Sequence, residues 1–597
     1  MPWQNTQGNK NEQDHPQPFF LSKRFMTRLH ALALTLATEM HGLEDSFRQR
    51  YASLLLYRLL FMHFLQRLGL LAGDTRYLQR RLEHGGFYRG FLRPLFREGR
   101  FPDLARLPLS QLFSSREIED AHPAIEIADE PFRQLLELFD EYLTLEGRRT
   151  RGAQAALMAE LLGEVCEQHE HSRETGTYYT PRVVTSYIVR NTLPLALVTR
   201  TRALCPAPGL LEELIWQTLV SEPLRYIYPA TLQGYAEPLP PEIAAGLTDV
   251  TRRASWQQGA PPTYAHPGES WREVLRRRAR VDEILNWTRQ ETPVPLERLV
   301  TWNINMPALL LHTLRTCQRA EVLSACYESV RQLSVLDPTC GTGAFLCAAI
   351  PFLQDLYTVC LARMEAWCAD PGSEHPLTLA QRGKFAAWLA EAGPSSERAS
   401  QILQWIIAHN LYGVDLHEEA VEVCRLRLYL KLLAASPTGQ PPALAQTFAA
   451  HLHVGNSLLG SLDRAPCREQ GPSAAVHMAA RPSRYQQALH WGRVFPVPLA
   501  RGGFDVVIGN PPYIEYERVR PLYQVEGYAT LETGNLYALT MERALHLLAP
   551  GGRFGMIVPA SATCTQGYRT LQKLLLAQQE LHVASFSDQR GHLFALS

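Results

Sequence analysis

The chain has 597 residues, more than one hydrophobic core usually organises, so we expect several domains. Hydrophobic residues make up 46% and charged residues 20%, as in ordinary soluble globular proteins, and the formal net charge is zero. The neutral balance excludes a long-range field that would steer nucleic acid, so any such contact depends on local basic clusters.

Residues 1–18 are polar and lack the apolar core of a signal peptide, so we expect an unstructured lead-in and no export. The eleven cysteines include no Cys-x-x-Cys pair, which argues against a zinc site and a disulfide framework. No stretch comes near the roughly 20 apolar residues that a membrane span needs. We therefore expect a cytoplasmic protein without a metal site or membrane contact.

Helical patterns dominate residues 19–175, which we expect to form a helical N-terminal domain. The stretch 51–71 is strongly apolar with sparse charges, which is typical of a helix buried on most sides, and 131–145 is amphipathic. Arginines are dense at 89–100 and again at 272–280. Each run has two interpretations, a nucleic-acid contact or a solvated helix face.

Residues 176–330 begin with a turn that reads TYYTP at 177–181 and leads into a helix. Thr180 can cap this helix, because its hydroxyl can accept a free backbone N–H, and Pro181 suits the first helical position. From about 199 to 330 helix and loop are mixed and prolines cluster. We interpret this stretch as an insertion packed beside a catalytic domain.

Apolar strands alternate with helices over residues 331–597, which predicts a doubly wound α/β sheet. We expect strands at 335–337, 411–415, 451–455, 504–509 and 553–558, with helices at 344–366, 418–435 and 535–549. Ligands on such a sheet bind beyond the carboxyl ends of the strands. The motifs described next all lie at those ends.

A glycine loop follows the first of these strands and reads DPTCGTGAF at 337–345. Gly341 and Gly343 permit a tight turn and a close backbone approach to a ligand, and the next helix offers free N–H groups to an anion. A nucleotide or dinucleotide would also fit. No third glycine completes the dinucleotide pattern, and Asp337 and Pro338 precede the loop, so we favour S-adenosyl-L-methionine as the cofactor.

Two further strands end in polar residues. Asp415 ends the second strand, where a carboxylate can accept hydrogen bonds from both ribose hydroxyls of a cofactor, or can cap the next helix. Asn456 follows the third strand, where it can bond the edge of an adenine or cap a turn. Both alternatives remain open for each residue.

The fourth strand delivers the tetrapeptide Asn510, Pro511, Pro512 and Tyr513. An exocyclic amino nitrogen is a poor nucleophile, because its lone pair is delocalised into the ring. The side-chain oxygen of Asn510 and the backbone carbonyl of Pro511 can accept its N–H bonds and free that lone pair. The two prolines fix the acceptors in advance.

The aromatic ring of Tyr513 can stack on the substrate ring, which is worth about 1–3 kcal/mol for a base on an aromatic side chain. The alternative is a proline-rich loop without chemistry. Together with the glycine loop upstream, the tetrapeptide predicts an enzyme that moves a methyl group onto an exocyclic nitrogen.

At these motifs the chain resembles the γ-class N6-adenine DNA methyltransferases. The resemblance is closest to the methylases of type IIG restriction-modification enzymes and of BREX- and DISARM-like phage-defence systems. It implies a Rossmann-like S-adenosylmethionine-dependent methyltransferase domain over 331–597 that acts on double-stranded DNA with a flipped adenine. It also implies that Tyr178 and Thr180 close over the methionine end of the cofactor and that Phe345 packs against it.

Two departures from this family affect the prediction. Family members usually continue into a target-recognition domain, whereas this sequence stops at Ser597, so we expect a fragment, a split gene or a partner that reads the DNA sequence. The nuclease motif of type IIG enzymes has no convincing match in the first 170 residues, so we predict no cleavage. The alternatives are a cofactor-binding subunit that is inactive without a partner, or a methyltransferase acting on RNA or on a protein glutamine.

Overall fold

The structure is a computed structural model that describes residues 22–99, 101–104, 107–113, 117–143, 150–169, 180–290, 293–369, 377–436, 447–462 and 484–585. The lead-in expected at 1–18 and the predicted cofactor residue Tyr178 lie outside these ranges. The described chain is mixed α/β with a parallel sheet at its centre, so the predicted class is confirmed.

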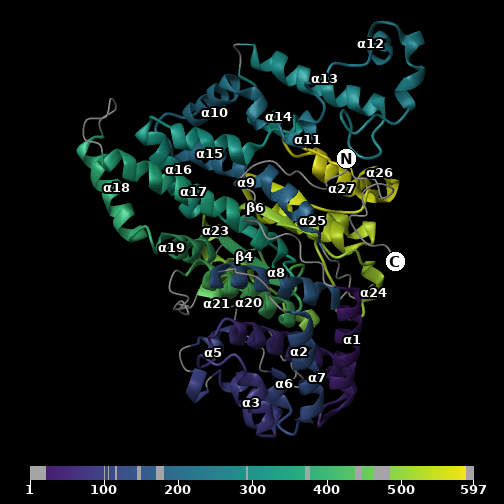
Figure 1. Cartoon of the computed structure of the whole chain (residues 1–597), viewed down its shortest axis with the longest axis vertical. Coiled ribbons are helices and arrows are strands. Elements are labelled where there is room, and N and C mark those ends of the chain that lie inside the picture. Colours follow the sequence, from purple (N-terminus) through teal and green to yellow (C-terminus); the bar gives the residue numbers. More distant parts are fainter. Residues whose placement is uncertain are drawn as a thin grey trace.

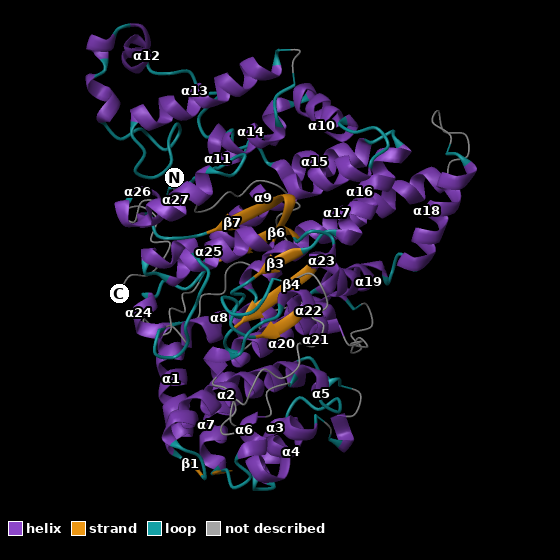
Figure 2. Ribbon diagram, turned by 180° about the vertical axis from the view of Figure 1, so that it is seen from behind, coloured by secondary structure: helices purple, strands orange, loops and turns teal. Residues whose placement is uncertain are grey.

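The central sheet has five strands in the order β5-β4-β3-β6-β7, and every neighbouring pair is parallel. The strands are β3 (Val335–Asp337), β4 (Leu411–Asp415), β5 (Leu452–Val454), β6 (Phe504–Gly509) and β7 (Leu548–Met556). Figure 2 shows them as one stack of arrows in the middle of the molecule. Three strands have the predicted bounds, β5 is shorter, and β7 begins five residues before the predicted 553. The strand order reverses between β3 and β6, which is where open α/β sheets bind ligands.

Helices cover both faces of the sheet. Val335, Val506 and Ile508 point into the large core with α17 (Ala344–Ala369), α9 (Arg182–Leu204) and α20 (Glu418–Ala435). Leu336 and Val507 point into a second core with α25 (Leu536–Leu547) and α22 (Trp491–Val494). Because successive side chains of a strand point to opposite faces, these uninterrupted apolar runs are what a sheet buried on both sides requires.

Among the described helices, α17 alone has the length and apolar composition that could cross a membrane. The prediction that no stretch comes near a membrane span is therefore too strong. In the structure 67% of the most apolar window of α17 is buried inside the protein. A central helix packed against a sheet needs the same composition, so its burial explains its apolar character.

The residues before the sheet are mainly helical in the described ranges. They run from α1 (Lys23–Thr38) to α8 (Arg151–His169), with one short antiparallel pair, β1 (Met40–His41) and β2 (Glu126–Ile127). Figure 1 shows the helices from α1 to α7 (Asp129–Tyr142) gathered below the sheet, with α8 between them and the sheet. The predicted apolar helix is α2 (Asp45–Arg67), whose residues 51–62 are almost all buried.

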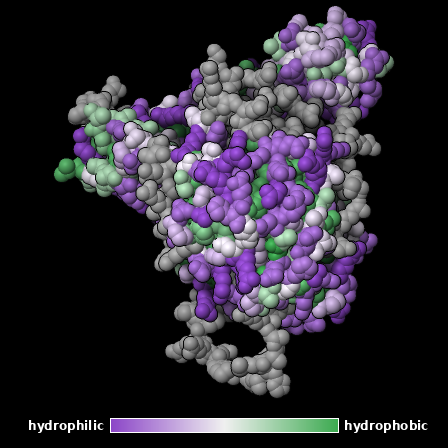
Figure 3. Space-filling model, turned by 60° about the horizontal axis from the view of Figure 1, so that its bottom comes forward, coloured by the Kyte–Doolittle hydropathy of each residue, from purple (hydrophilic) through white to green (hydrophobic). Residues whose placement is uncertain are grey.

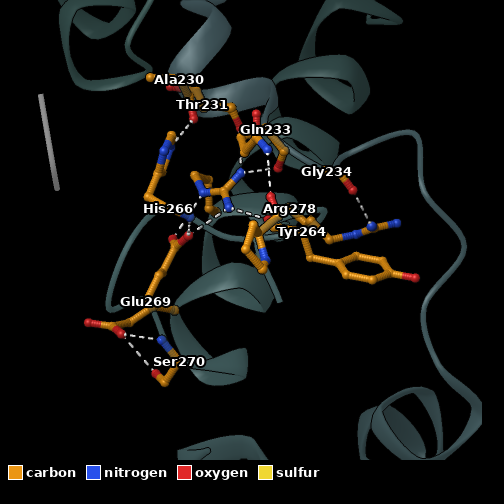
Figure 4. A network of polar contacts seen from close by, with 12 residues as sticks. Ala230, Thr231, Gln233, Gly234, Tyr264, His266, Glu269, Ser270 and Arg278 are labelled. Atoms are coloured by element: carbon orange, nitrogen blue, oxygen red, sulfur yellow. Dashed lines mark hydrogen bonds and ion pairs between the residues drawn. The ribbon is translucent and has the colours of Figure 1, made fainter. Parts of the chain in front are cut away.

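The end of the stretch between α9 and β3 packs against α17 as α15 (Met306–Thr316) and α16 (Ala320–Gln332). Its middle part forms an arm at the top of Figure 1 that includes α12 (Pro241–Thr248) and α13 (Trp271–Thr288). Its centre is the network drawn in Figure 4. Arg277 is buried and donates hydrogen bonds to both oxygens of Glu269, at 3.0 and 2.8 Å, and to the carbonyl of Tyr264 at 2.9 Å. Arg278 donates to the carbonyl of Gly234 at 2.8 Å.

Both interpretations of the arginine run at 272–280 are therefore wrong for Arg277. Its guanidinium holds the loops of the arm together and faces neither solvent nor a partner. In the orientation of Figure 3 the forward face of the molecule is mostly hydrophilic, with apolar residues scattered between polar ones. Scattered apolar residues of this kind are normal on the surface of a folded protein.

Candidate functional site

The glycine loop after β3 and the tetrapeptide after β6 contact each other directly. The hydroxyl of Thr339 donates a hydrogen bond to the carbonyl of Asn510 at 3.4 Å. Gly509 permits the approach, because a Cβ there would lie 2.8 Å from Oδ1 of Asp337. The two predicted motifs therefore form one site at the edge of the sheet where the strand order reverses.

Backbone geometry explains both glycines of the loop. Gly341 and Gly343 have φ values of +50° and +83°, which residues other than glycine rarely adopt. A Cβ at Gly343 would lie 2.4 Å from the sulfur of Cys424 on α20, so this glycine also allows close packing of loop and helix. A Cβ at Gly341 would meet nothing within 4 Å, so that side of the loop has room for a ligand.

Asp337 is a buried carboxyl at the end of β3. Its Oδ1 accepts the backbone N–H of Thr339 at 3.1 Å. Burial raises the pKa of Asp337 well above its usual value, and the nearby Asp415 raises that pKa further. A cation placed beside Asp337 would lower this pKa again, because it would favour the charged carboxylate. Pro338 follows, and its carbonyl accepts a hydrogen bond from the hydroxyl of Ser457.

Asp415 lies half-buried at the end of β4 and binds two backbone amides. Its Oδ2 accepts the N–H of Gly341 at 2.8 Å, and its Oδ1 accepts the N–H of His417 at 2.8 Å. The first contact fixes the glycine loop, and the second supports the turn before α20. Each carboxylate oxygen has a second lone pair, so these contacts leave acceptors for hydroxyl groups of a ligand.

Asn456 is buried, and its side chain organises a turn. Its Nδ2 donates to the carbonyl of Tyr485 at 2.9 Å, and its Oδ1 accepts the N–H of Leu458 at 3.0 Å. These contacts correspond to the turn-capping alternative. The predicted contact with an adenine edge stays a prediction.

Asn510 is held by two neighbours whose positions determine the direction of its amide. Its Nδ2 donates to the hydroxyl oxygen of Thr180 at 2.9 Å, and its Oδ1 accepts the hydroxyl of Tyr513 at 2.6 Å. The prediction that the Thr180 side chain caps α9 is therefore wrong. The helix begins at Arg182, and its N-cap residue is Pro181, which makes no side-chain capping bond. The Thr180 hydroxyl points across to the tetrapeptide instead.

The rest of the tetrapeptide combines a rigid backbone with an aromatic wall. Pro511 is buried and Pro512 is half-buried. The Tyr513 ring meets Tyr537 edge-on, with centroids 6.1 Å apart, and Tyr537 stacks on Tyr568 at 5.3 Å. The Tyr513 hydroxyl also lies 2.8 Å from the carbonyl of Ile557, so its one proton is shared between this carbonyl and Asn510.

Phe345 lies in the hydrophobic core in this structure. Its side chain is 2% exposed and belongs to the large core under the loop. In this conformation its ring packs in the core and supports the glycine loop. Among the described residues, no group of three or more His, Cys, Asp or Glu side chains is placed to hold a metal ion.

Sequence reasoning missed three residues that hold the loop from the side of the N-terminal helices. Thr342 donates its hydroxyl proton to Glu167 at the end of α8. Arg427 on α20 donates to the Thr342 carbonyl at 2.8 Å and to its hydroxyl at 2.9 Å. No local pattern could have found this cluster, because Glu167 and Thr342 lie 175 residues apart in the chain.

Comparison with known proteins assigns part of this site to a family. Residues 409–590 match the family described as Eco57I restriction-modification methylase. The matched residues make up less than a third of the chain. The match includes Asp415, Asn456 and the tetrapeptide at 510–513. The predicted resemblance to restriction-modification methylases is thereby confirmed.

Individual relatives of the chain are distant. The type II restriction enzyme and methyltransferase RM.Eco57I of Escherichia coli is 24% identical over 323 residues, which cover 52% of this chain and 28% of the relative. The adenine-specific methyltransferase PglX of Streptomyces coelicolor is 28% identical over 186 residues, 31% of this chain and 12% of the relative. The chain thus spans less than a third of the length of these relatives.

A solved structure of the type IIL restriction-modification enzyme MmeI in complex with DNA also matches the chain. The TM-score is 0.42 and the identity 13%, and the match covers 93% of this chain and 53% of that chain.

Proposed function

We propose that this chain transfers a methyl group from S-adenosyl-L-methionine to the N6 amino group of adenine in DNA, as the modification component of a restriction-modification or phage-defence system. The observation that carries the proposal is the contact between Thr339 in the glycine loop and Asn510 in the tetrapeptide. A methyl donor on the first motif and an amino acceptor on the second would be neighbours. The names of the two relatives, a restriction methyltransferase and an adenine-specific methyltransferase, support it.

The proposed catalytic domain is a Rossmann-like methyltransferase domain over 331–597, preceded by a helical domain over 19–175 and a flanking segment over 176–330. The strand order supports this division. Numbered from β3 as the first strand, the sheet reads 3-2-1-4-5, which is the order of doubly wound nucleotide-binding folds.

The residues at the end of the sheet fit S-adenosylmethionine, which supplies an electrophilic methyl group on a sulfonium when bound. The open side of Gly341 gives the cofactor room against the backbone, and the free lone pairs of Asp415 suit its ribose hydroxyls. The buried carboxyl of Asp337 suits its ammonium group, because a cation would relieve the cost of that buried charge. Asn456 would face its adenine, and Tyr178, Thr180 and Phe345 its methionine end.

The tetrapeptide performs the chemistry by accepting hydrogen bonds. Within the described residues the Pro511 carbonyl accepts no hydrogen bond, so it is available to one amino proton, and Oδ1 of Asn510 is available to the other. Both bonds strengthen as the nitrogen becomes positive, so they stabilise the transition state more than the bound substrate. The nitrogen forms its bond to the methyl carbon while the sulfur–carbon bond breaks. The nitrogen then loses a proton to solvent.

The proposed partner is double-stranded DNA with the target adenine turned out of the stack. Turning a base out costs a few kcal/mol, and stacking on Tyr513 would offset part of this cost. A separate target-recognition subunit or another defence protein is proposed to supply sequence choice. We place the reaction in the cytoplasm, where such DNA is found.

The test is methyl transfer by the purified chain. It is incubated with S-adenosylmethionine and unmodified plasmid DNA, beside Asn510→Ala, and N6-methyladenine is measured by mass spectrometry. We expect product from the wild type and a rate reduced roughly 100- to 1,000-fold or more in the variant, with cofactor affinity nearly unchanged. Equal loss of affinity and rate would mean that the tetrapeptide is structural.

Parallel reactions separate the alternatives. Product on RNA or on a glutamine peptide, with none on DNA, would overturn the choice of substrate. Cofactor binding without transfer to any of the three would favour a subunit that needs a partner.

A further inference from the structure

Glu167 lies where the N-terminal helices meet the proposed cofactor loop. It belongs to the last turn of α8, and only 12% of its side chain is exposed. Its carboxylate accepts the hydroxyl of Thr342 from the loop, and its Oε1 lies 3.8 Å from Nη1 of Arg427 on α20. One carboxylate therefore contacts both the loop and the helix that packs beside it.

Thr342 is the residue of the loop that forms hydrogen bonds to α8 and α20. It stands between two glycines, which restrict the backbone least of all residues. Its hydroxyl donates to Glu167 and accepts from Arg427 at 2.9 Å, so both of its hydrogen-bonding roles are used. Its carbonyl accepts from the same guanidinium at 2.8 Å. These bonds immobilise a loop that its own sequence leaves free.

Arg427 completes the cluster and ties it to α8. Its Nε donates to the carbonyl of Ala159 at 3.0 Å, and its Nη1 lies 3.8 Å from Glu167. The guanidinium passes over Gly163, where a Cβ would lie only 2.3 Å from its central carbon. The absence of a side chain at Gly163 therefore makes room for the contact.

We propose that Glu167 is a positioning residue that presets the glycine loop for the cofactor through the Thr342 hydroxyl. The helical N-terminal part of the chain would then take part in cofactor binding. The physical reason is preorganisation, since a loop already held in its binding conformation loses less entropy when a ligand arrives. This inference rests on the proposed function, because it assumes that the loop binds S-adenosylmethionine.

The test is a double-mutant cycle on the full chain, read as the Kd for S-adenosylmethionine by titration calorimetry. Thr342→Val removes the hydroxyl at nearly constant shape, and Glu167→Ala removes its acceptor. We expect each variant to raise Kd roughly tenfold, and the double variant to raise it by little more than either alone. Thr342→Ser, which restores the hydroxyl, should return Kd close to that of the wild type.

A matched control and a stability measurement keep the outcomes distinct. Gln168→Ala changes the exposed neighbour of Glu167 on the same turn and should leave Kd unchanged. The Tm of each variant is measured, and Thr342→Val carries the test if Glu167→Ala does not fold. Independent, multiplicative effects in the double variant, or unchanged Kd in Thr342→Val, would overturn the inference. A wild type that binds no cofactor would instead refute the proposed function.

Discussion

At the scale of single residues, the direction of one amide determines what the tetrapeptide can do. The Thr180 hydroxyl oxygen accepts one Nδ2 proton of Asn510, so Oδ1 is turned toward Tyr513 and the space above the tetrapeptide. In the proposed reaction, a reversed amide would present donors to an amino group that needs acceptors. Asp337 and Asp415 add a second constraint, because two carboxyls near each other at the loop disfavour ionisation of the buried one.

The raised pKa of Asp337 predicts a pH-dependent cost to stability. In the folded chain the pKa of Asp337 lies above its unfolded value. The side chain therefore makes its full contribution to the free energy of unfolding below about pH 4, and this contribution is lost as pH rises through the folded pKa. We therefore expect Asp337→Asn to be more stable than the wild type at about pH 8, on the order of 1–3 kcal/mol, with a smaller gain at about pH 5.

Urea unfolding at both pH values measures the change in Asp337→Asn. The same variant should bind S-adenosylmethionine more weakly, because a neutral amide cannot balance an ammonium group. A stability gain that is equal at both pH values would refute the explanation by ionisation. A gain together with full cofactor affinity would remove Asp337 from the binding role.

At the scale of elements, the pair α8 and α20 connects the N-terminal helices to the sheet. Two glycines of α8 allow the close approach. A Cβ at Gly152 would lie 2.6 Å from the carbonyl of Ala434, and one at Gly163 would meet Arg427. Gly152 and Gly163 are eleven positions apart, which is close to three helical turns, so both lie on the same face of α8. Composition alone would have suggested a weak helix at these positions.

Gly163→Ala should therefore destabilise the chain, although alanine is the better helix former. We expect a loss of about 1–3 kcal/mol from overpacking against Arg427. The matched control is Gly383→Ala in α18 (Leu379–Ala392), where an added Cβ meets nothing within 4 Å and the residue is exposed. There we expect a gain of up to about 1 kcal/mol. Urea unfolding midpoints compare the two, and a gain at both positions would contradict the close packing.

At the scale of the whole molecule, a buried ion pair joins the N-terminal helices to α20. Arg58 of α2 is fully buried and forms two bonds to Glu422, of 2.6 and 2.9 Å, and one to Glu119 of 2.7 Å. Phe96 and Phe113 lie against its guanidinium, at 5.0 and 5.4 Å from the ring centroids. A buried charge held this way is costly to leave without its partner.

Glu422→Gln should loosen this junction, because it leaves the Arg58 guanidinium buried with one carboxylate. We expect a loss of roughly 3–5 kcal/mol. The control is Glu141→Gln, which breaks the exposed pair with Arg28, whose side chains are 42% and 50% exposed. That loss should stay below about 1 kcal/mol. Chemical unfolding followed by tryptophan fluorescence compares them, and equal losses would mean that the buried pair does not anchor the helices.

Most of the central sheet could be predicted from local sequence patterns. The strands β3, β4 and β6 have their predicted bounds, because strands buried on both faces read as unbroken apolar runs that end in turn residues. The same reading located the glycine loop, Asp415 and the tetrapeptide. Local patterns report backbone preferences over a few neighbouring residues, which is enough for these features.

The contacts between distant segments could not be predicted from the sequence. Thr180 faces Asn510 from 330 positions away, and Glu167 reaches Thr342 across 175. Arg277, one of several arginines in a run, points inward because the half-buried carboxylate of Glu269 and loop carbonyls surround it. A hydrogen bond between distant segments depends on how helices and sheet pack, and no property of either segment alone encodes its partner.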